Sequence, residues 1–578
     1  LAEGGTVDVN AKNEGELNTV ALNIAASGGS AAFAGAVAVA NVEQNTTAEI
    51  VSADIKAEAA DKPAGDVSVT AAGKPTGRTF AIVGTGAGNG VAIGAGVAVN
   101  LLKADTIATI SGGKVHAANV LTNAVSNLDL LNIGMGVAGA GNGGAVSGSV
   151  AVNKLTGNTK AKIAGGAKVT AEKNAVVSAK SDDRIQNYAG QLTVAGTGAA
   201  IGLSTSTNII GSNTKAEISG KGTEVISHAT DGVAATQIKD GLDHEKLYNG
   251  SLTVDTGALI GLDGLAEGRK DTEYRGVAVS ASATHTANSF IASGGGAGVG
   301  ASVAGTVNTN VVGGSTTARI VNATAKADGA DVSVRADDAT NSGALVGTIS
   351  VAGEGAAVGT GSSINLINRT TEAEAVRSII TAKNAAIAAR SAQGIAVLTV
   401  GVSFADEFGL ANSNNFVRME QSTRAALMNS TVNVSGLSVT ADNTANLNAF
   451  AKTLGTAGYG VAVGVGTAVL LDRSTTEADI AGTKVFYTDD KGETLVHAKN
   501  TENLNNYVFS IGAAGITGVG ASISGGDVKN TVKAAVTDSA LGHAKANDAD
   551  TEEETAAKRI TVAAENNVNF DQKSGTGG

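Results

Sequence analysis

Apolar and polar residues alternate with a period of two along most of this chain, and two short versions of the alternation recur. One is apolar-x-apolar-x-Ala, as at residues 7–11, 67–71 and 332–336. The other is Thr-x-Ala-x-apolar, as at residues 46–50 and 316–320. Successive side chains of a strand point to opposite faces, so both patterns predict strands with one buried face. The residues predicted to point inward include Ile50, Val67, Val69, Ile320, Val332, Val334 and Ile480.

The two patterns keep the same spacing. Copies of the first close at Ala11, Ala71 and Ala124, and later at Ala336 and Ala389, steps of 60, 53 and 53 residues. Copies of the second follow the same rhythm, so both markers give one period of roughly 55 residues. A repeat of this kind predicts stacked units, each of which buries its apolar positions against its neighbours.

A third element, rich in Gly and Ala, lies between the two markers, as at residues 82–100 and 455–471. Its alternation predicts strands, and its central glycines predict a tight turn or a close approach of two backbones. The fold class is therefore predicted to be all-β, an elongated parallel β-solenoid of about nine or ten units of roughly 55 residues. Each unit is either two turns of the solenoid or one turn with a long hairpin. Polar residues that follow the first marker are expected at one corner, where they bond along the stack: Asn13, Asp338, Asn443, Asn500 and Asn566.

The composition supports a stack of thin layers. The chain has 78 Gly, 2 Pro, no Cys and no Trp, and only 3% of its residues are aromatic although 43% are hydrophobic. Small and β-branched side chains suit repeated layers better than a globular core with aromatic anchors. Scarce Pro and the lack of a three-residue Gly period exclude collagen, and a net charge of −12 argues against nucleic acid as a partner.

One interval breaks the rhythm. The first marker steps by 102 residues between Ala179 and Ala281. The predicted organisation is therefore solenoid repeats over residues 1–228, an irregular insertion or degenerate unit over 229–276, and further repeats over 277–578. Side-chain variety in a repeat protein concentrates where the rhythm breaks, so recognition is expected to map to this segment first.

The irregular segment also holds the densest group of chemically versatile side chains. Asp243, His244, Glu245, Tyr248 and Tyr274 are the candidate binding residues, with an exposed loop as the simpler interpretation. No catalytic, cofactor-binding or metal-binding residues are predicted, because the His residues lack metal-ligand spacing and the glycine-rich stretches precede strands rather than helices. The acidic pairs at residues 182–183, 337–338 and 489–490 are interpreted as solvated turns.

The alternation of Thr-x-Ala-x-Ile strands with Val-x-Val-x-Ala-x-Asn strands resembles the passenger regions of filamentous-haemagglutinin-like and leukotoxin-type large bacterial adhesins. The resemblance covers nearly the whole chain and implies a right-handed parallel β-helix that folds after passage through an outer-membrane pore. Residues 90–94, Gly-Val-Ala-Ile-Gly, also resemble a head repeat of trimeric autotransporter adhesins, but those repeats recur at much shorter spacing.

The resemblance implies a non-enzymatic adhesin passenger segment on the surface of a Gram-negative-type bacterium, exported by type V secretion. Its expected partners are a protein or glycan on a host or bacterial cell, with lateral self-association as a further expectation. Two alternatives stay open. One is a β-helix polysaccharide lyase or hydrolase, which would need clustered carboxylates and sugar-stacking aromatics that the sequence does not display. The other is a purely structural surface filament.

Overall fold

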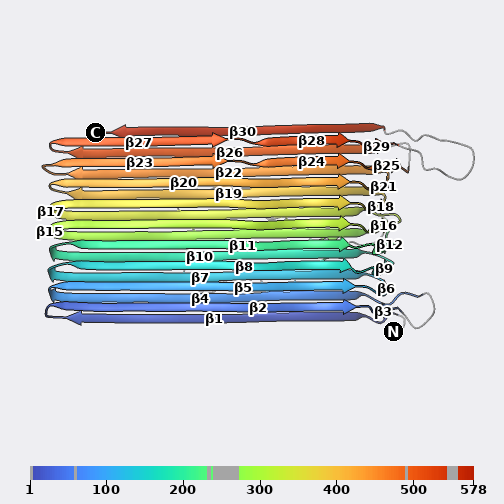
Figure 1. Cartoon of the computed structure of the whole chain (residues 1–578), viewed down its shortest axis with the longest axis horizontal. Coiled ribbons are helices and arrows are strands. Elements are labelled where there is room, and N and C mark those ends of the chain that lie inside the picture. The colour runs from blue at the N-terminus through green and yellow to red at the C-terminus, as the bar shows by residue number, and fades with distance from the viewer. Residues whose placement is uncertain (1–3, 57–61, 231–235, 238–272, 489–491, 543–557) are drawn as a thin grey trace, which may run out of the picture.

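The protein is seen in a computed structural model that describes residues 4–56, 62–230, 236–237, 273–488, 492–542 and 558–578 (Figure 1). The described residues form strands and connecting turns, with no helix among them. Nearly all strands belong to a stack of parallel layers, and each layer contains two long strands and one short strand. The structure confirms the predicted all-β parallel solenoid.

The first long strand of each layer belongs to one broad parallel sheet, the first-strand sheet. It contains ten strands, two of which continue into the return sheet. They are β1 (Val7–Ser27), β4 (Val67–Asn89), β7 (Val120–Asn142), β10 (Ala175–Thr197), the first halves of β15 (Val277–Val321) and β17 (Val332–Val376), β19 (Asn384–Ala405), β22 (Gly436–Ala457), β26 (Glu493–Ala514) and β30 (Arg559–Gly577).

The second long strand runs back and forms the return sheet, which faces the first. Its members are β2 (Ala31–Val51), β5 (Val91–Ser111), β8 (Ala145–Ala164), β11 (Ala200–Ser219), the second halves of β15 and β17, β20 (Phe408–Met428), β23 (Val461–Asp472) with β24 (Thr475–Ala481), and β27 (Thr517–Val528) with β28 (Thr531–Thr537). The turn between the two sheets falls in the Gly-rich stretch. Gly90, for example, has a φ of +112°, and a Cβ there would lie 1.8 Å from the carbonyl oxygen of Ser30. The prediction of a tight turn is confirmed.

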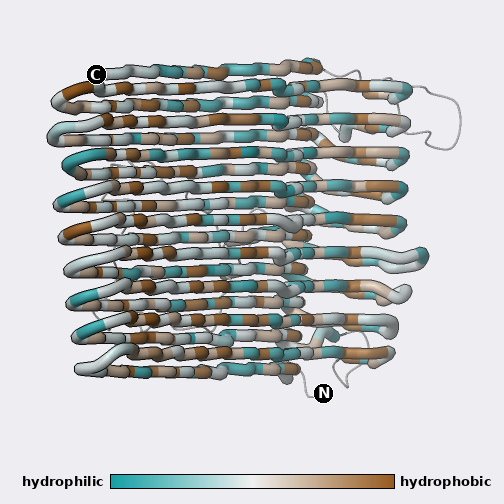
Figure 2. The backbone as a smooth tube through the Cα atoms, turned by 60° about the vertical axis from the view of Figure 1, so that its left-hand side comes forward, coloured by the Kyte–Doolittle hydropathy of each residue, from teal (hydrophilic) through white to brown (hydrophobic). Residues whose placement is uncertain are grey.

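A third, narrow sheet closes the opposite end of each layer and projects from it (Figure 2). It is called the edge sheet here and comprises β3 (Asp54–Ile55), β6 (Lys114–Ala117), β9 (Lys168–Ala171), β12 (Glu224–Ser227), β16 (Thr324–Ala327), β18 (Ile379–Thr381), β21 (Thr431–Val434), β25 (Lys484–Tyr487) and β29 (Ala540–Leu541). The corner before each edge strand uses a left-handed residue. In five layers this residue is not glycine: Ser52, Asn322, Arg377, Asn429 and Asp538, with φ between 48° and 51°.

The pairing register shows that one repeat makes one layer. Val7 pairs with Val67, and Val67 pairs with Val120, so the first marker of each unit stacks on that of the next. Thr46 pairs with Thr106 in the same way. The two long strands of a unit face each other across the interior instead of pairing as a hairpin. The structure thus selects one turn of the solenoid per unit of roughly 55 residues.

The apolar core is concentrated at the edge-sheet end, where three sheets surround a triangular interior. The Val and Ala of the first marker, the Ala and Ile of the second and the alternate residues of the edge strands form one continuous cluster. The seven residues that were predicted to point inward all lie in this cluster. Val69, Val334, Ile320 and Ile480 are fully buried, and Ile50, Val67 and Val332 are nearly so. The triangular end is a continuous hydrophobic column that runs through the stack.

Between the two long sheets the interior is narrow and contains both polar columns and separate apolar clusters, which include Leu102, Leu130, Ile185, Ile395 and Leu447. Asn side chains at one position form a ladder from layer to layer. Asn153 donates to Asn208 at 2.9 Å, Asn208 to Asn310 at 2.9 Å, and Asn310 to Asn365 at 3.0 Å. Because each amide both donates and accepts, stacking one per layer satisfies polar groups that would otherwise be costly to bury.

The polar residues that follow the first marker occupy one column, but they do not lie at a corner. Asp338, Asn443 and Asn500 are in mid-strand and point into the interior, with at most 3% of their surface exposed. The predicted bonding along the stack is confirmed, because Asn443 donates to Asn500 at 2.8 Å and Asn500 to Asn566 at 2.9 Å. The prediction of a corner at these positions was wrong, since the strand continues past them.

The layers on either side of the irregular segment are joined directly. Ala175 of β10 pairs with Val277 of β15, and Glu224 of β12 pairs with Thr324 of β16, so no layer separates them. The described residues of the segment include the antiparallel pair β13 (Thr236–Gln237) and β14 (Glu273–Tyr274). The layers are wide, and the longest axis of the molecule follows the strands while the stack axis is shorter (Figure 1).

Candidate ligand-binding groove

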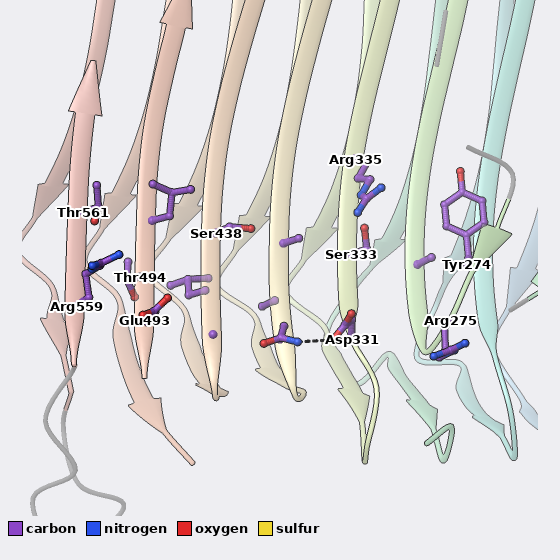
Figure 3. Close-up of a pocket in the computed structure, with 17 residues that line it drawn as sticks. Tyr274, Arg275, Asp331, Ser333, Arg335, Ser438, Glu493, Thr494, Arg559 and Thr561 are labelled. Atoms are coloured by element: carbon purple, nitrogen blue, oxygen red, sulfur yellow. Dashed lines mark hydrogen bonds between the residues drawn. The ribbon is translucent and has the colours of Figure 1, made fainter. Parts of the chain in front are cut away.

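A groove crosses the outer face of the first-strand sheet near the starts of its strands (Figure 3). Its volume is about 660 Å³, and it passes over β15, β17, β19, β22, β26 and β30. Neighbouring strands are about 4.8 Å apart, so the groove extends across the strands for about 24 Å. It is therefore long enough for an extended ligand lying perpendicular to the strands.

The floor of the groove is one column of outward-pointing residues. Ala278 pairs with Ser333, Ser333 with Ala386, and Ala386 with Ser438. These are the x positions of the first marker, which point to the outer side of the sheet because the flanking Val and Ala positions face the core. Ala278 is nevertheless buried, whereas the other three are partly exposed. Short side chains in four successive layers leave the sheet surface low at this place, which produces the hollow.

Charged side chains surround this floor. Arg275, Arg335 and Arg559 contribute guanidinium groups, and Asp331 and Glu493 contribute carboxylates. Asp331 also accepts a hydrogen bond from Asn384 Nδ2 at 2.9 Å, seen as the dashed line in Figure 3. Guanidinium groups recognise carboxylate, sulfate or phosphate groups through paired donors. Three arginines in one groove of a chain with a net charge of −12 favour an acidic ligand group.

The two carboxylates are too far apart for the paired-carboxylate chemistry of glycoside hydrolases. The residues at the starts of the strands form one column across the groove. In this column Asp331, Asn384, Gly436 and Glu493 follow one another, one per layer. Three layer spacings amount to about 14 Å, whereas catalytic carboxylate pairs lie about 5–9.5 Å apart. The groove thus has the composition of a binding surface.

Of the five candidate residues from the irregular segment, Tyr274 lies at this groove. Its hydroxyl donates to Ser280 Oγ at 2.8 Å, which holds the ring against the first-strand sheet. Asp243, His244, Glu245 and Tyr248 lie outside the described residues. Sequence reasoning missed Arg335 and Arg559. The available signal was the row of small residues at outward positions of successive markers, Ala278, Ser333, Ala386 and Ser438.

A second cluster of ionisable side chains lies inside the stack. His285 Nδ1 is 2.9 Å from Asp183 Oδ2, and Arg369 Nε donates to Asp338 Oδ2 at 3.2 Å. His285 Nε2 lies 3.7 Å from the same Asp338 oxygen, and Ser212 Oγ donates to Asp183. The interpretation of residues 182–183 and 337–338 as solvated turns was wrong, since these pairs lie in β10 and β17. Residues 489–490 lie outside the described chain.

Mutual pairing permits this burial. Burial alone raises the pKa of the Asp338 carboxyl, but the Arg369 guanidinium, which also donates to it, and the neighbouring His285 ring hold that pKa well below its usual range. Burial and Arg369 lower the pKa of His285, and the neighbouring Asp183 and Asp338 carboxylates outweigh them and raise it. Serine, histidine and aspartate together are the groups of hydrolases, yet Asp183, His285 and Asp338 have fully buried side chains. We assign the cluster a structural role.

A buried carboxyl pair lies in the later layers. Glu502 of β26 accepts from Asn530 Nδ2 at 2.5 Å and is hydrogen-bonded to Asp472, which in turn accepts from Ser474 Oγ at 2.6 Å. Burial, followed by the neighbouring Asp472, raises the pKa of Glu502 to about 8. At neutral pH Glu502 is therefore protonated and acts as a hydrogen-bond donor inside the stack.

Two searches for other kinds of site gave no candidates. In the part of the chain that the structure describes, no group of three or more His, Cys, Asp or Glu side chains is placed to hold a metal ion. Over the same described ranges, no helix is long and apolar enough to cross a membrane.

Comparison with known proteins adds no assignment to the groove geometry. No protein-family model matches the chain, and neither the curated proteins nor the solved structures contain a significant match.

Proposed function

We propose that this chain is a segment of an extracellular bacterial adhesin, in which the stacked layers form a rigid scaffold and the groove binds a ligand on a cell surface. The groove is the observation that carries the proposal. It is a depression over six neighbouring strands, and most of its polar groups lie in two columns of successive layers. Surfaces of this kind on solenoids suit long ligands, because the contacts repeat at the spacing of the layers.

The ligand class that fits best is an acidic glycan or an acidic protein segment. The three arginines supply directional donors for acidic groups, and the floor residues Ser333 and Ser438 supply hydroxyls between them. The carboxylates Asp331 and Glu493 lie at the same edge, where they suit hydroxyl or amide donors of the ligand. The repeat pattern of the sequence, which resembles large secreted adhesins, supports placement outside a Gram-negative-type cell.

The first prediction concerns the groove arginines. Replacing Arg335 and Arg559 by Ala should weaken binding to cells or to an acidic-glycan panel at least about tenfold, since two charge-assisted contacts are lost. Replacing Arg418, which lies on the return sheet and pairs with Glu420, by Ala should leave binding unchanged. Bound protein is measured by flow cytometry and on the glycan panel, and thermal unfolding verifies that each variant is folded.

Equal binding by the parent and the groove variant would contradict a role for the groove. The same preparations are incubated with acidic and neutral polysaccharides. Release of reducing or unsaturated ends, lost in the groove variant, would replace the adhesin proposal by a glycan-cleaving enzyme.

A further inference from the structure

The outer face of the return sheet contains four adjacent columns without any charged residue. They begin in the first layer at Phe33, Gly35, Val37 and Val39, and each continues through the nine strands of the return sheet. We call these four columns the return face. Its first column is apolar in every layer: Phe33, Ile93, Val146, Ile201, Val303, Val358, Leu410, Val463 and Val519.

Large apolar side chains of the return face are open to solvent. Phe33 is 64% exposed, Val37 67% and Ile523 59%. The next column toward the edge sheet is the first that contains charged residues, such as Lys154, Arg418 and Asp527. Soluble monomers rarely expose contiguous apolar patches above a few hundred Å². The exposed apolar residues of the face, which Thr360, Ser362, Asn412 and Asn414 interrupt in the middle layers, therefore indicate an interaction surface.

The dimensions of the return face match a stable protein interface. Nine strands about 4.8 Å apart span about 38 Å, and four alternate positions about 6.7 Å apart span about 20 Å, so the face covers about 770 Å². A standard interface buries about 800 Å² on each partner. The face is therefore large enough to hold two folded molecules together.

The shape of the face is suited to a copy of itself. The second column is small in the first three layers, at Gly35, Ala95 and Gly148, where apolar residues of the first and third columns flank it. Leu203 occupies the same column in the fourth layer. A ridge of Val or Ile from one molecule can enter this furrow in another, as in face-to-face sheet packing. In a two-fold dimer the same patch must complement itself, and a face without charge meets its copy without repulsion.

We propose that the return face is the interface of a homodimer in which two stacks pack sheet against sheet. A lipid surface is the less favoured occupant. Polar side chains such as Thr360, Asn412 and Asn414 lie in the second and third columns, where hydrocarbon would leave their polar groups without partners. Packing against a second copy leaves the groove open, because the groove lies on the first-strand sheet.

The test is sedimentation velocity over a wide range of protein concentration. The chain should sediment as a dimer that dissociates on dilution, and three lysines in the third column of the face should weaken dimerisation at least about tenfold. The matched control places three lysines at equally exposed positions of the opposite outer face and should dimerise like the parent. The face variant is V37K/V150K/V307K, and the control is V137K/L192K/I349K.

Three outcomes would overturn the proposal. They are a parent that stays monomeric at every concentration, equal loss of dimer in both variants, and a monomer that co-sediments with vesicles of zwitterionic lipid through the same face. A second readout uses the absence of cysteine. Thr205→Cys, in the third column, should crosslink between molecules with a short bifunctional maleimide, whereas Ala513→Cys on the opposite sheet should not. The reverse pattern would also refute the proposal.

Discussion

At the residue scale, the sequence predicts which side chains are inside but not which polar ones join them. Val69 and Ile320 were predictable because alternation assigns them to the buried face. Asp338 and Glu502 also lie at positions that alternation assigns to the buried face. Their residue type predicts the opposite, because acidic side chains usually face water. Their partners are distant in the chain: Arg369 lies in the returning half of the same strand β17, and Asp472 lies in β23 of the preceding layer. Only the folding back of the chain and the register of the layers bring them together.

The second prediction concerns the buried carboxyl of Glu502. Its pKa is raised to about 8 from 4.5, so the folded state binds a proton that the unfolded state releases. Stability is therefore highest below about pH 4.5 with respect to this group, and falls as the pH rises toward 8. Glu502→Gln keeps a donor toward Asp472 and should remove most of this fall, which amounts to about 5 kcal/mol.

The measurement is the thermal unfolding midpoint of parent and variant between pH 5 and pH 9, with the high end of that range about one unit above the Glu502 pKa. The variant should match the parent in acid and exceed it in base. Glu493→Gln, an exposed change on the same strand, serves as the control and should follow the parent throughout. If the midpoint of the parent rose with pH over this range and the variant showed no gain, the raised pKa of Glu502 would be contradicted.

At the scale of the element, the corner before each edge strand is the position where local conformation and residue type disagree. A left-handed conformation suits Gly, which occupies this corner at Gly112, Gly165, Gly220 and Gly482. Arg377 adopts the same conformation with a φ of 48°. The third prediction is that Arg377→Gly stabilises the protein or leaves it unchanged, by relief of about 1 kcal/mol of backbone strain.

The matched change is Gly482→Ala, which should destabilise by about 1 kcal/mol or more, because a Cβ there would lie 2.5 Å from Asn429 Oδ1 and the φ is +59°. Chemical denaturation of both variants checks the pair. If Arg377→Gly were clearly less stable than the parent, the hydrogen bond from Arg377 Nε to Asn322 Oδ1 would matter more than the strain.

The sequence located the strands well at this scale, but it left their grouping undecided. Both markers and the Gly-rich turn were visible as patterns. The choice between one and two turns per unit was not, because residues 82–89 and 91–100 alternate in the same way whether their strands pair with each other or with the next layer. The groove was missed for a related reason, since its floor combines outward positions that lie more than 50 residues apart in the chain.

At the scale of the whole molecule, stability is the sum of contacts between neighbouring layers. Layers in the middle of the stack are covered on both sides, as β15 is by β10 and β17. β1 and β30 are each covered on one side, and their residues are largely half-buried or exposed.

The fourth prediction is that the rate of amide hydrogen exchange increases from the middle of the stack toward its first and last layers. Amides of β15 and β17 should exchange slowest, and those of β1, β2, β27 and β30 fastest, after correction for intrinsic rates. Exchange followed by mass spectrometry resolves the layers by peptide. Uniform protection from β1 to β30 would mean that the stack opens as one unit.

The constant register between layers also bears on how such a protein changes length. Every layer presents the same columns to the layer before it and the layer after it, so removing or duplicating one whole repeat rejoins strands in phase. Recombination between neighbouring repeats in the gene would therefore yield a shorter or longer chain that still folds, with the groove and the return face changed in extent but not in character. A deletion of part of a repeat has no such outcome, because it shifts inward residues to the outer face. Variation in length by whole layers is thus the form of divergence that this architecture tolerates best.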